Sequence, residues 1–133
     1  MSDELQKLEP SALLPLIMSG AGDALKSPHA REVYLLSTYI AGSGYVDGIT
    51  EIFESIEIGD PLTLQREPTN PHDERAIAVY DVKDRRIGYI PRHKNEVFSR
   101  LMDAGFILYG KLIDMKTPAS WPELTLAIYL EVL

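Results

Sequence analysis

Most of the chain after residue 31 consists of short apolar runs that either alternate with polar positions or are rich in β-branched and aromatic residues. Both patterns are typical of β-strands. Such runs occupy residues 32–40, 62–64, 76–80, 87–90, 106–115 and 124–133. Six short strands separated by turn residues predict a mainly β fold, either a small barrel or a strongly bent sheet.

One helix is well defined by its pattern. Asn95 is a favourable N-cap and Gly105 a typical stop, so the sequence predicts a helix from Asn95 to Ala104. The side chains expected to form its buried stripe are Val97, Phe98, Leu101 and Met102. Residues 49–58 are ambiguous, because their apolar positions fit a helical face while the last two isoleucines alternate as in a strand.

Residues 1–30 differ from the rest of the chain. Their leucine and isoleucine positions have approximate helical spacing, Ser11 is a suitable N-cap, and Gly20 and Gly22 mark a stop. The chain is therefore predicted to carry an N-terminal helical extension over residues 1–30, followed by a β-barrel domain over residues 31–133. The extension would pack on the barrel or on a second copy of the chain.

The composition excludes several classes of protein. The 133 residues include no cysteine, which rules out disulfides and zinc sites that need thiolates. The apolar run from Ala12 to Met18 is too short to span a bilayer, and it follows acidic residues instead of the basic start of a signal peptide. We therefore expect a soluble, cytoplasmic protein of one main domain with no membrane partner.

The charge of the chain is unevenly distributed. A net charge of −7 argues against broad binding to nucleic-acid backbones, which needs a basic footprint. Residues 45–62 contain five acids and no lysine or arginine, whereas residues 83–100 contain six basic residues and two acids. This pattern allows one locally positive face on an acidic body; a solvated surface of mixed charge is the alternative.

A polar turn over residues 67–74 joins two of the predicted strands. Its two prolines fix φ and push the preceding residues toward extended geometry, while asparagine and aspartate side chains can hydrogen-bond the local backbone. The turn should therefore be rigid and hold His72, Asp73 and Arg75 at one edge of the sheet, where they would form a binding rim.

Several spaced blocks of the chain resemble the HIRAN domain family. The matching blocks, in order, are residues 40–45, 59–64, 66–68, 70–73, 76–79 and 87–92. This family occurs at the N-terminus of some eukaryotic fork-remodelling helicases and as small stand-alone bacterial proteins. The resemblance covers about residues 34 to 133, and it implies a small OB-like six-stranded β-barrel with helical additions and a pocket for the 3′ end of single-stranded DNA.

The resemblance also implies which residues line that pocket. Tyr45 matches the family's aromatic residue after the first strand and would stack on a terminal base, and Asp73 matches its turn aspartate, which would accept the proton of the 3′-hydroxyl. His72 stands where the family has a tyrosine, and Trp121 falls near an aromatic residue of the last loop. Arg92 can reach a phosphate or cap the helix that follows it.

Two positions depart from the DNA-binding eukaryotic members of the family. Gly44 replaces an arginine and Glu74 replaces a lysine, so both changes remove positive charge beside the expected phosphate. Structural roles also remain open for three of the implied site residues. Tyr45 can close the barrel, Trp121 can plug its core, and Asp73 can cap backbone N–H groups of the turn.

These observations predict a non-catalytic module that binds single-stranded DNA 3′ ends in DNA repair or replication-fork processing, without a cofactor. The chain has no G-x-x-x-x-G-K-[ST] loop, no G-x-S-x-G elbow and no metal-ligand spacing among its three histidines, so catalysis is not expected. The alternative is a protein-interaction or oligomerisation module that does not bind DNA, which the net charge and Gly44 favour.

Overall fold

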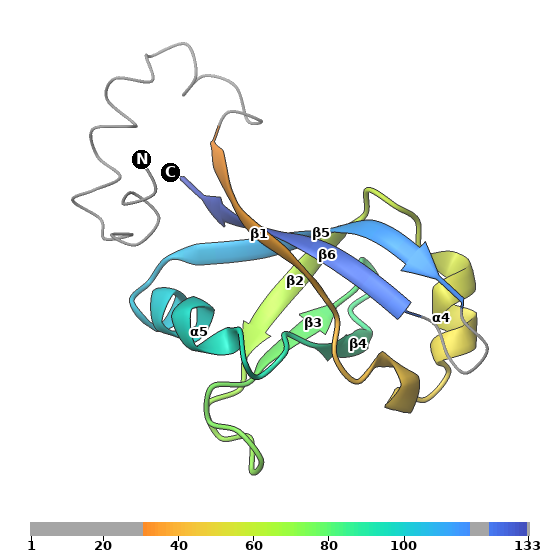
Figure 1. Cartoon of the computed structure of the whole chain (residues 1–133), viewed down its shortest axis with the longest axis horizontal. Coiled ribbons are helices and arrows are strands. Elements are labelled where there is room, and N and C mark those ends of the chain that lie inside the picture. The colour runs from red at the N-terminus through yellow and green to blue at the C-terminus, as the bar shows by residue number, and fades with distance from the viewer. Residues whose placement is uncertain (1–30, 118–122, 133) are drawn as a thin grey trace.

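The computed structural model describes residues 31–117 and 123–132, which form one antiparallel sheet with a helix at each side (Figure 1). The strands are β1 (Glu32–Tyr39), β2 (Pro61–Arg66), β3 (Ile77–Tyr80), β4 (Arg86–Tyr89), β5 (Ile107–Lys116) and β6 (Glu123–Glu131). All six predicted strands are confirmed. The extension predicted for residues 1–30 and the candidate site residue Trp121 lie outside the described residues.

The sheet is strongly bent but is not closed into a full barrel. Its strand order is β1-β6-β5-β2-β3-β4, and all neighbours are antiparallel. No ladder joins the edge strands β1 and β4 within the described residues; a single bridge between Ala41 and Tyr89 links these edges, with N–H···O distances of 2.8 and 2.9 Å. The sheet therefore does not close into the predicted barrel. The chain leaves β1 and turns at Gly42, which has a positive φ of 77°.

The alternating pattern of the strands places their apolar face in one core. In β2, Leu62 and Leu64 are buried while Thr63 and Gln65 are exposed. The fully buried large side chains include Leu62, Ile77, Val79, Ile87, Ile90, Leu112, Leu124, Leu126, Ile128 and Leu130. Burial of each such side chain stabilises the fold by about 1.5–3 kcal/mol, so this core fixes where the connecting turns lie.

Two short helices follow β1. The 3-10 helix η2 (Ser43–Tyr45) forms the tight turn after the bridge, and α4 (Ile49–Ser55) follows it. The ambiguous segment 49–58 is thus helical in its first part, with Ile49 and Ile52 buried against the core. The helical spacing of these two isoleucines prevails because it directs both toward the same side of the sheet.

Helix α5 (Asn95–Asp103) confirms the predicted helix and its stop but corrects its start and its buried face. Gly105 has φ of 102°, and the N–H of Phe106 bonds the carbonyl of Leu101, as in a Schellman ending. Asn95 is not the N-cap: it is the first helical residue, and its side chain is buried. Because Asn95 points inward, Val97 lies on the outer face and is 58% exposed.

Candidate functional site

The turn between β2 and β3 is held in shape by its own side chains. Oδ1 of Asn70 accepts the backbone N–H groups of His72 and Asp73 at 2.8 and 3.2 Å. Oδ1 of Asp73 then accepts the N–H of Arg75 at 3.0 Å. These bonds satisfy successive donors of the turn, so the expected capping roles of Asn70 and Asp73 are confirmed.

Arg66 attaches this turn to α5. Its guanidinium donates to both carboxylate oxygens of Asp103, at 2.9 and 3.1 Å, and to the carbonyls of Ala76 at 2.8 Å and Glu74 at 3.0 Å. The Arg66 side chain is only 14% exposed. Arg66 therefore holds both the neck of the turn and the end of the helix, a positioning role that the sequence pattern did not reveal.

Truncation of Arg66 should loosen the turn far more than loss of its ion-pair partner. We expect Arg66→Ala to lower the free energy of unfolding by about 1–3 kcal/mol, because the partly buried carbonyl of Ala76 and the exposed carbonyl of Glu74 both lose a charged donor. Asp103→Ala, the matched control, removes only an exposed ion pair and should cost much less. Urea denaturation of both variants measures the difference, and equal losses would show that the carbonyl contacts contribute nothing.

Glu67 and Tyr89 form a second attachment of the turn. Oε1 of Glu67 accepts the side-chain amide of Asn70 and the hydroxyl of Tyr89, both at 2.9 Å. Burial and this hydrogen bond raise the pKa of Tyr89, and the charge of Arg86 offsets the rise only in part. Tyr89 thus remains a neutral donor that ties the turn to β4.

The residues of the turn surround a shallow hollow of about 490 Å³, called the turn hollow below. Its lining consists of Asn70, Pro71, His72, Asp73, Glu74, Arg75 and Arg92. Four of the six predicted site residues are therefore brought together, although Arg92 lies seventeen positions beyond Arg75 in the chain. His72 and Arg92 are exposed, whereas Asp73 is partly buried.

Asp73 is the best-defined acceptor in the turn hollow. Its Oδ2 accepts the side-chain amide of Asn95 at 2.8 Å and lies 3.7 Å from Nε of Arg92. Partial burial acts to raise the pKa of Asp73, but the hydrogen bonds from Asn95 and Arg75 and the charges of Arg92 and Arg75 outweigh it, so the pKa lies below its ordinary value. Asp73 is therefore ionised at neutral pH and fixed in orientation.

Carboxylates neutralise both cations of the turn hollow. Arg92 pairs with Asp73, and Arg75 lies 3.5 Å from Glu96. With Glu74 also at its rim, the hollow carries no excess of positive charge. A locally positive face on residues 83–100 thus remains a prediction, supported outside the hollow by exposed basic residues of β4 and its preceding turn.

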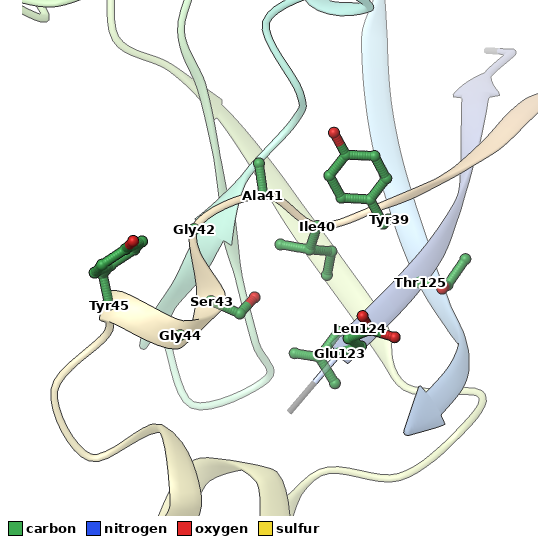
Figure 2. A pocket seen from close by; sticks show the side chains of 10 residues that line it. All are labelled: Tyr39, Ile40, Ala41, Gly42, Ser43, Gly44, Tyr45, Glu123, Leu124 and Thr125. Carbon is green, nitrogen blue, oxygen red and sulfur yellow. The ribbon is translucent and has the colours of Figure 1, made fainter. Parts of the chain in front are cut away.

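A second hollow of about 640 Å³, called the tyrosine hollow below, lies beside η2 (Figure 2). Its lining consists of Tyr39, Ile40, Ala41, Gly42, Ser43, Gly44, Tyr45, Glu123, Leu124 and Thr125. Figure 2 shows Tyr39 and Tyr45 on either side of the glycine-containing turn. Tyr45 is 94% exposed, so it does not close the barrel, and its ring is free to contact a ligand.

Strand β4 connects the two hollows. The hydroxyl of Ser43, which is buried, donates to the carbonyl of Ile87 at 2.8 Å and fixes η2 against the strand. The backbone of Tyr89 pairs with Ala41 of the tyrosine hollow, while its hydroxyl bonds Glu67 at the base of the polar turn. The predicted site residues are thus divided: Tyr45 lies in one hollow and the other four described residues in the next, with Tyr89 linking them.

The described part of the chain contains neither a metal-binding cluster nor a membrane-spanning helix. Within residues 31–117 and 123–132, no group of three or more histidine, aspartate or glutamate side chains is arranged to hold a metal ion. In the same ranges no helix is both long and apolar enough to cross a bilayer.

The bent six-stranded sheet, the helix α5 and the polar turn at the sheet's rim define a small OB-like β domain. The family model of the HIRAN domain matches residues 33–132 of the chain. The chain therefore belongs to the HIRAN domain family, as its spaced sequence blocks indicated.

Individual relatives agree with this assignment. A crystal structure of a protein from Lactobacillus plantarum has 31% identity and a TM-score of 0.69, covering 74% of this chain and 94% of that one. The HLTF HIRAN domain in its DNA-bound conformation has 20% identity and a TM-score of 0.51, covering 74% of this chain and 78% of that one, and shares the fold. Helicase-like transcription factor of Oryctolagus cuniculus is 32% identical over 73 residues, which is 50% of this chain but only 7% of that protein.

Proposed function

We propose that this HIRAN domain is a non-catalytic module that binds single-stranded DNA at a free 3′ end and serves DNA repair or replication-fork processing. The observation that carries the proposal is Asp73, an ionised acceptor held by Asn95 at a hollow whose rim bears the exposed side chains of His72 and Arg92. Family membership and the DNA-bound conformation of the HLTF domain, which has the same fold, support it.

The chemistry of a strand terminus fits these groups. A terminal nucleotide has a free 3′-hydroxyl, which an internal nucleotide lacks, and this hydroxyl donates a hydrogen bond to the carboxylate of Asp73. The neighbouring phosphate accepts hydrogen bonds from Arg92. Bases next to the end stack on the exposed rings of Tyr45 and His72, at about 1–3 kcal/mol per base. Affinity then comes from stacking and end-specific hydrogen bonds, which is compatible with the net charge of −7.

The test compares two oligonucleotides of the same sequence, one with a free 3′-hydroxyl and one with a 3′-phosphate, by fluorescence anisotropy. We expect about tenfold tighter binding of the free end, since the blocked end places a second anion against Asp73. Asp73→Ala should abolish this preference.

Glu74→Ala is the matched control, because it removes one negative charge from the same turn, and the contact of Glu74 with Arg66 uses its backbone carbonyl and not its side chain. The control should retain the preference for the free hydroxyl. Equal affinity of the unaltered chain for both ends would reject end recognition, and loss of the preference in Glu74→Ala would attribute it to net charge instead of Asp73.

Protein binding is the second candidate function, and one groove favours it. The groove has a volume of about 420 Å³ and is lined mainly by apolar side chains of β1 and α5, among them Leu35, Leu36, Val97 and Phe98. Val97 is 58% exposed within this apolar lining, and contiguous exposed apolar surface is typical of protein-binding sites. Failure to bind any single strand at low salt, together with weaker association in Val97→Glu, would favour this function.

A further inference from the structure

Arg86 is a cation without an anionic partner among the described residues. Most basic side chains of the described residues are paired, including Arg66, Arg75, Arg85, Arg92, Arg100 and Lys111. Around Arg86, by contrast, no carboxylate of the described residues lies within 4 Å. Among the described residues, hydrogen bonds link Arg86 to the carboxylate of Glu67 only through the Tyr89 hydroxyl. Its charge is therefore less compensated than that of a directly paired arginine, and it attracts an external anion.

The guanidinium of Arg86 is nevertheless held in place. Its central carbon lies 5.4 Å from the centroid of the Tyr89 ring, and Nη1 donates to the Tyr89 hydroxyl at 3.2 Å. Stacking on an aromatic ring restricts the guanidinium while leaving N–H donors directed outward. Because the ring is itself fixed by Glu67, Arg86 presents a preorganised fork of donors, a geometry that suits phosphate.

Arg86 contacts Tyr89, and Tyr89 is connected to both hollows. Tyr89, which Arg86 contacts, pairs through its backbone with Ala41 in the lining of the tyrosine hollow. The Tyr89 hydroxyl bonds Glu67, which in turn bonds Asn70 in the lining of the turn hollow. The η2 turn itself supplies no cation, since it consists of Ser43, Gly44 and Tyr45. Because Tyr89 of β4 links the two hollows, a single DNA strand that contacts both Tyr45 and Asp73 would run beside Tyr89 and Arg86.

We propose that Arg86 binds a backbone phosphate of the single strand where the strand crosses β4 between the two hollows. This inference rests on the proposed function, because it assigns a contact within the same nucleic-acid complex. Arg86 thereby provides the positive charge that the glycine-containing turn lacks, and the carboxylate-paired Arg92 makes the weaker electrostatic contribution.

The test measures affinity and its salt dependence together. An oligothymidylate with a free 3′-hydroxyl is titrated with the full chain at several sodium chloride concentrations. We expect Arg86→Ala to weaken binding about tenfold at low salt. The slope of log K against log salt should become shallower by about 0.7, the value for one phosphate contact on a single strand. Arg86→Lys keeps the charge but not the fork, so it should retain the slope with an intermediate affinity.

Lys83→Ala is the matched control, since Lys83 is an exposed cation of the β3–β4 turn and its removal changes the net charge by the same amount. We expect it to leave affinity within about twofold and the slope unchanged. Equal effects of Arg86→Ala and Lys83→Ala, or no effect of Arg86→Ala, would overturn the inference while the proposed function stands. Failure of the unaltered chain to bind the oligonucleotide at low salt would reject both.

Discussion

Replacement of Gly88 by alanine is expected to be the most damaging single-methyl change in this domain. A Cβ at this position would lie 2.5 Å from the carbonyl oxygen of Ala41 and 2.5 Å from Cγ2 of Ile40, closer than real contacts allow. The residue also has a φ of 149°, which side chains of L-residues rarely adopt. Steric overlap with backbone and dihedral strain together should lower the free energy of unfolding by about 3–5 kcal/mol.

The functional consequence follows from what the methyl group displaces. The carbonyl of Ala41 accepts the N–H of Tyr89 at 2.9 Å and forms half of the bridge between the sheet edges. Ser43, whose hydroxyl would lie 3.1 Å from the new Cβ, anchors η2 and hence the position of Tyr45. Any Gly88→Ala protein that still folds should therefore show a displaced turn and weaker binding of single-stranded DNA.

Gly59→Ala separates dihedral strain from steric overlap in a chemical denaturation experiment. Gly59 also has a positive φ, of 100°, but a Cβ added there would meet no atom of the described residues within 4 Å beyond its chain neighbours. This variant should lose only about 1–2 kcal/mol through backbone strain. If Gly88→Ala were no less stable than Gly59→Ala, the close approach of Ala41 to β4 would not be a tight contact in solution.

Replacement of Asp81 by alanine should be comparably damaging, for an electrostatic reason. The Asp81 side chain is fully buried, and its oxygens accept the backbone N–H groups of Lys83 and Arg85, both at 2.9 Å, and Nε of Arg85 at 2.8 Å. Arg85 also donates to the hydroxyl of Ser55 at 2.7 Å, which connects the β3–β4 turn to α4. Loss of the carboxylate removes all of these hydrogen bonds to Asp81, and we expect the free energy of unfolding to fall by about 3–5 kcal/mol.

The dependence of stability on pH offers an independent check of Asp81. Burial acts to raise the pKa of Asp81, but hydrogen bonds from Arg85 and Lys83 and the charge of Arg85 outweigh it, so the pKa in the folded protein lies below the ordinary value of 3.8. Its contribution to stability is therefore complete above that value and is lost as the pH falls through the lower folded pKa. Asp81→Asn should flatten the acid limb of the stability curve, and an unchanged acid limb would contradict the assigned role.

Local sequence patterns were sufficient for the six strands and for the presence and end of helix α5. The two-residue period of β2 and β6 reports which side chains face the core, because successive residues of a strand point to opposite sides. The capping roles of Asn70 and Asp73 were equally visible, since an Asx turn involves only residues two or three positions apart. The spaced blocks of the chain further indicated the HIRAN family, which the family match confirms.

The residues that support the site were less visible in the sequence. Asn95 has the properties of an N-cap, yet its side chain is buried and its amide reaches Asp73, twenty-two positions away. Val97 lies off the buried face that Asn95 shares with Phe98 and Leu101, and it is exposed. Arg66 and Asp103 are separated by thirty-seven positions and meet because α5 packs beside the neck of the turn. The periodicity of apolar residues along the sequence does not indicate such pairs, because they depend on which helices and strands pack together.

The sequence by itself determined the strands, the main helix, the rigid polar turn and the family of this protein, since each depends on short-range periodicity or on residues in fixed order. Only the tertiary structure decided that the sheet edges meet at one bridge, that Tyr45 is exposed, and that the five predicted site residues within the described ranges occupy two hollows linked by Tyr89. It also showed that Arg86, which has no carboxylate within 4 Å among the described residues, is held against the ring of Tyr89. These features arise from long-range packing, in which the register of β4 against β3 and Ala41 fixes which charges meet and which stay free.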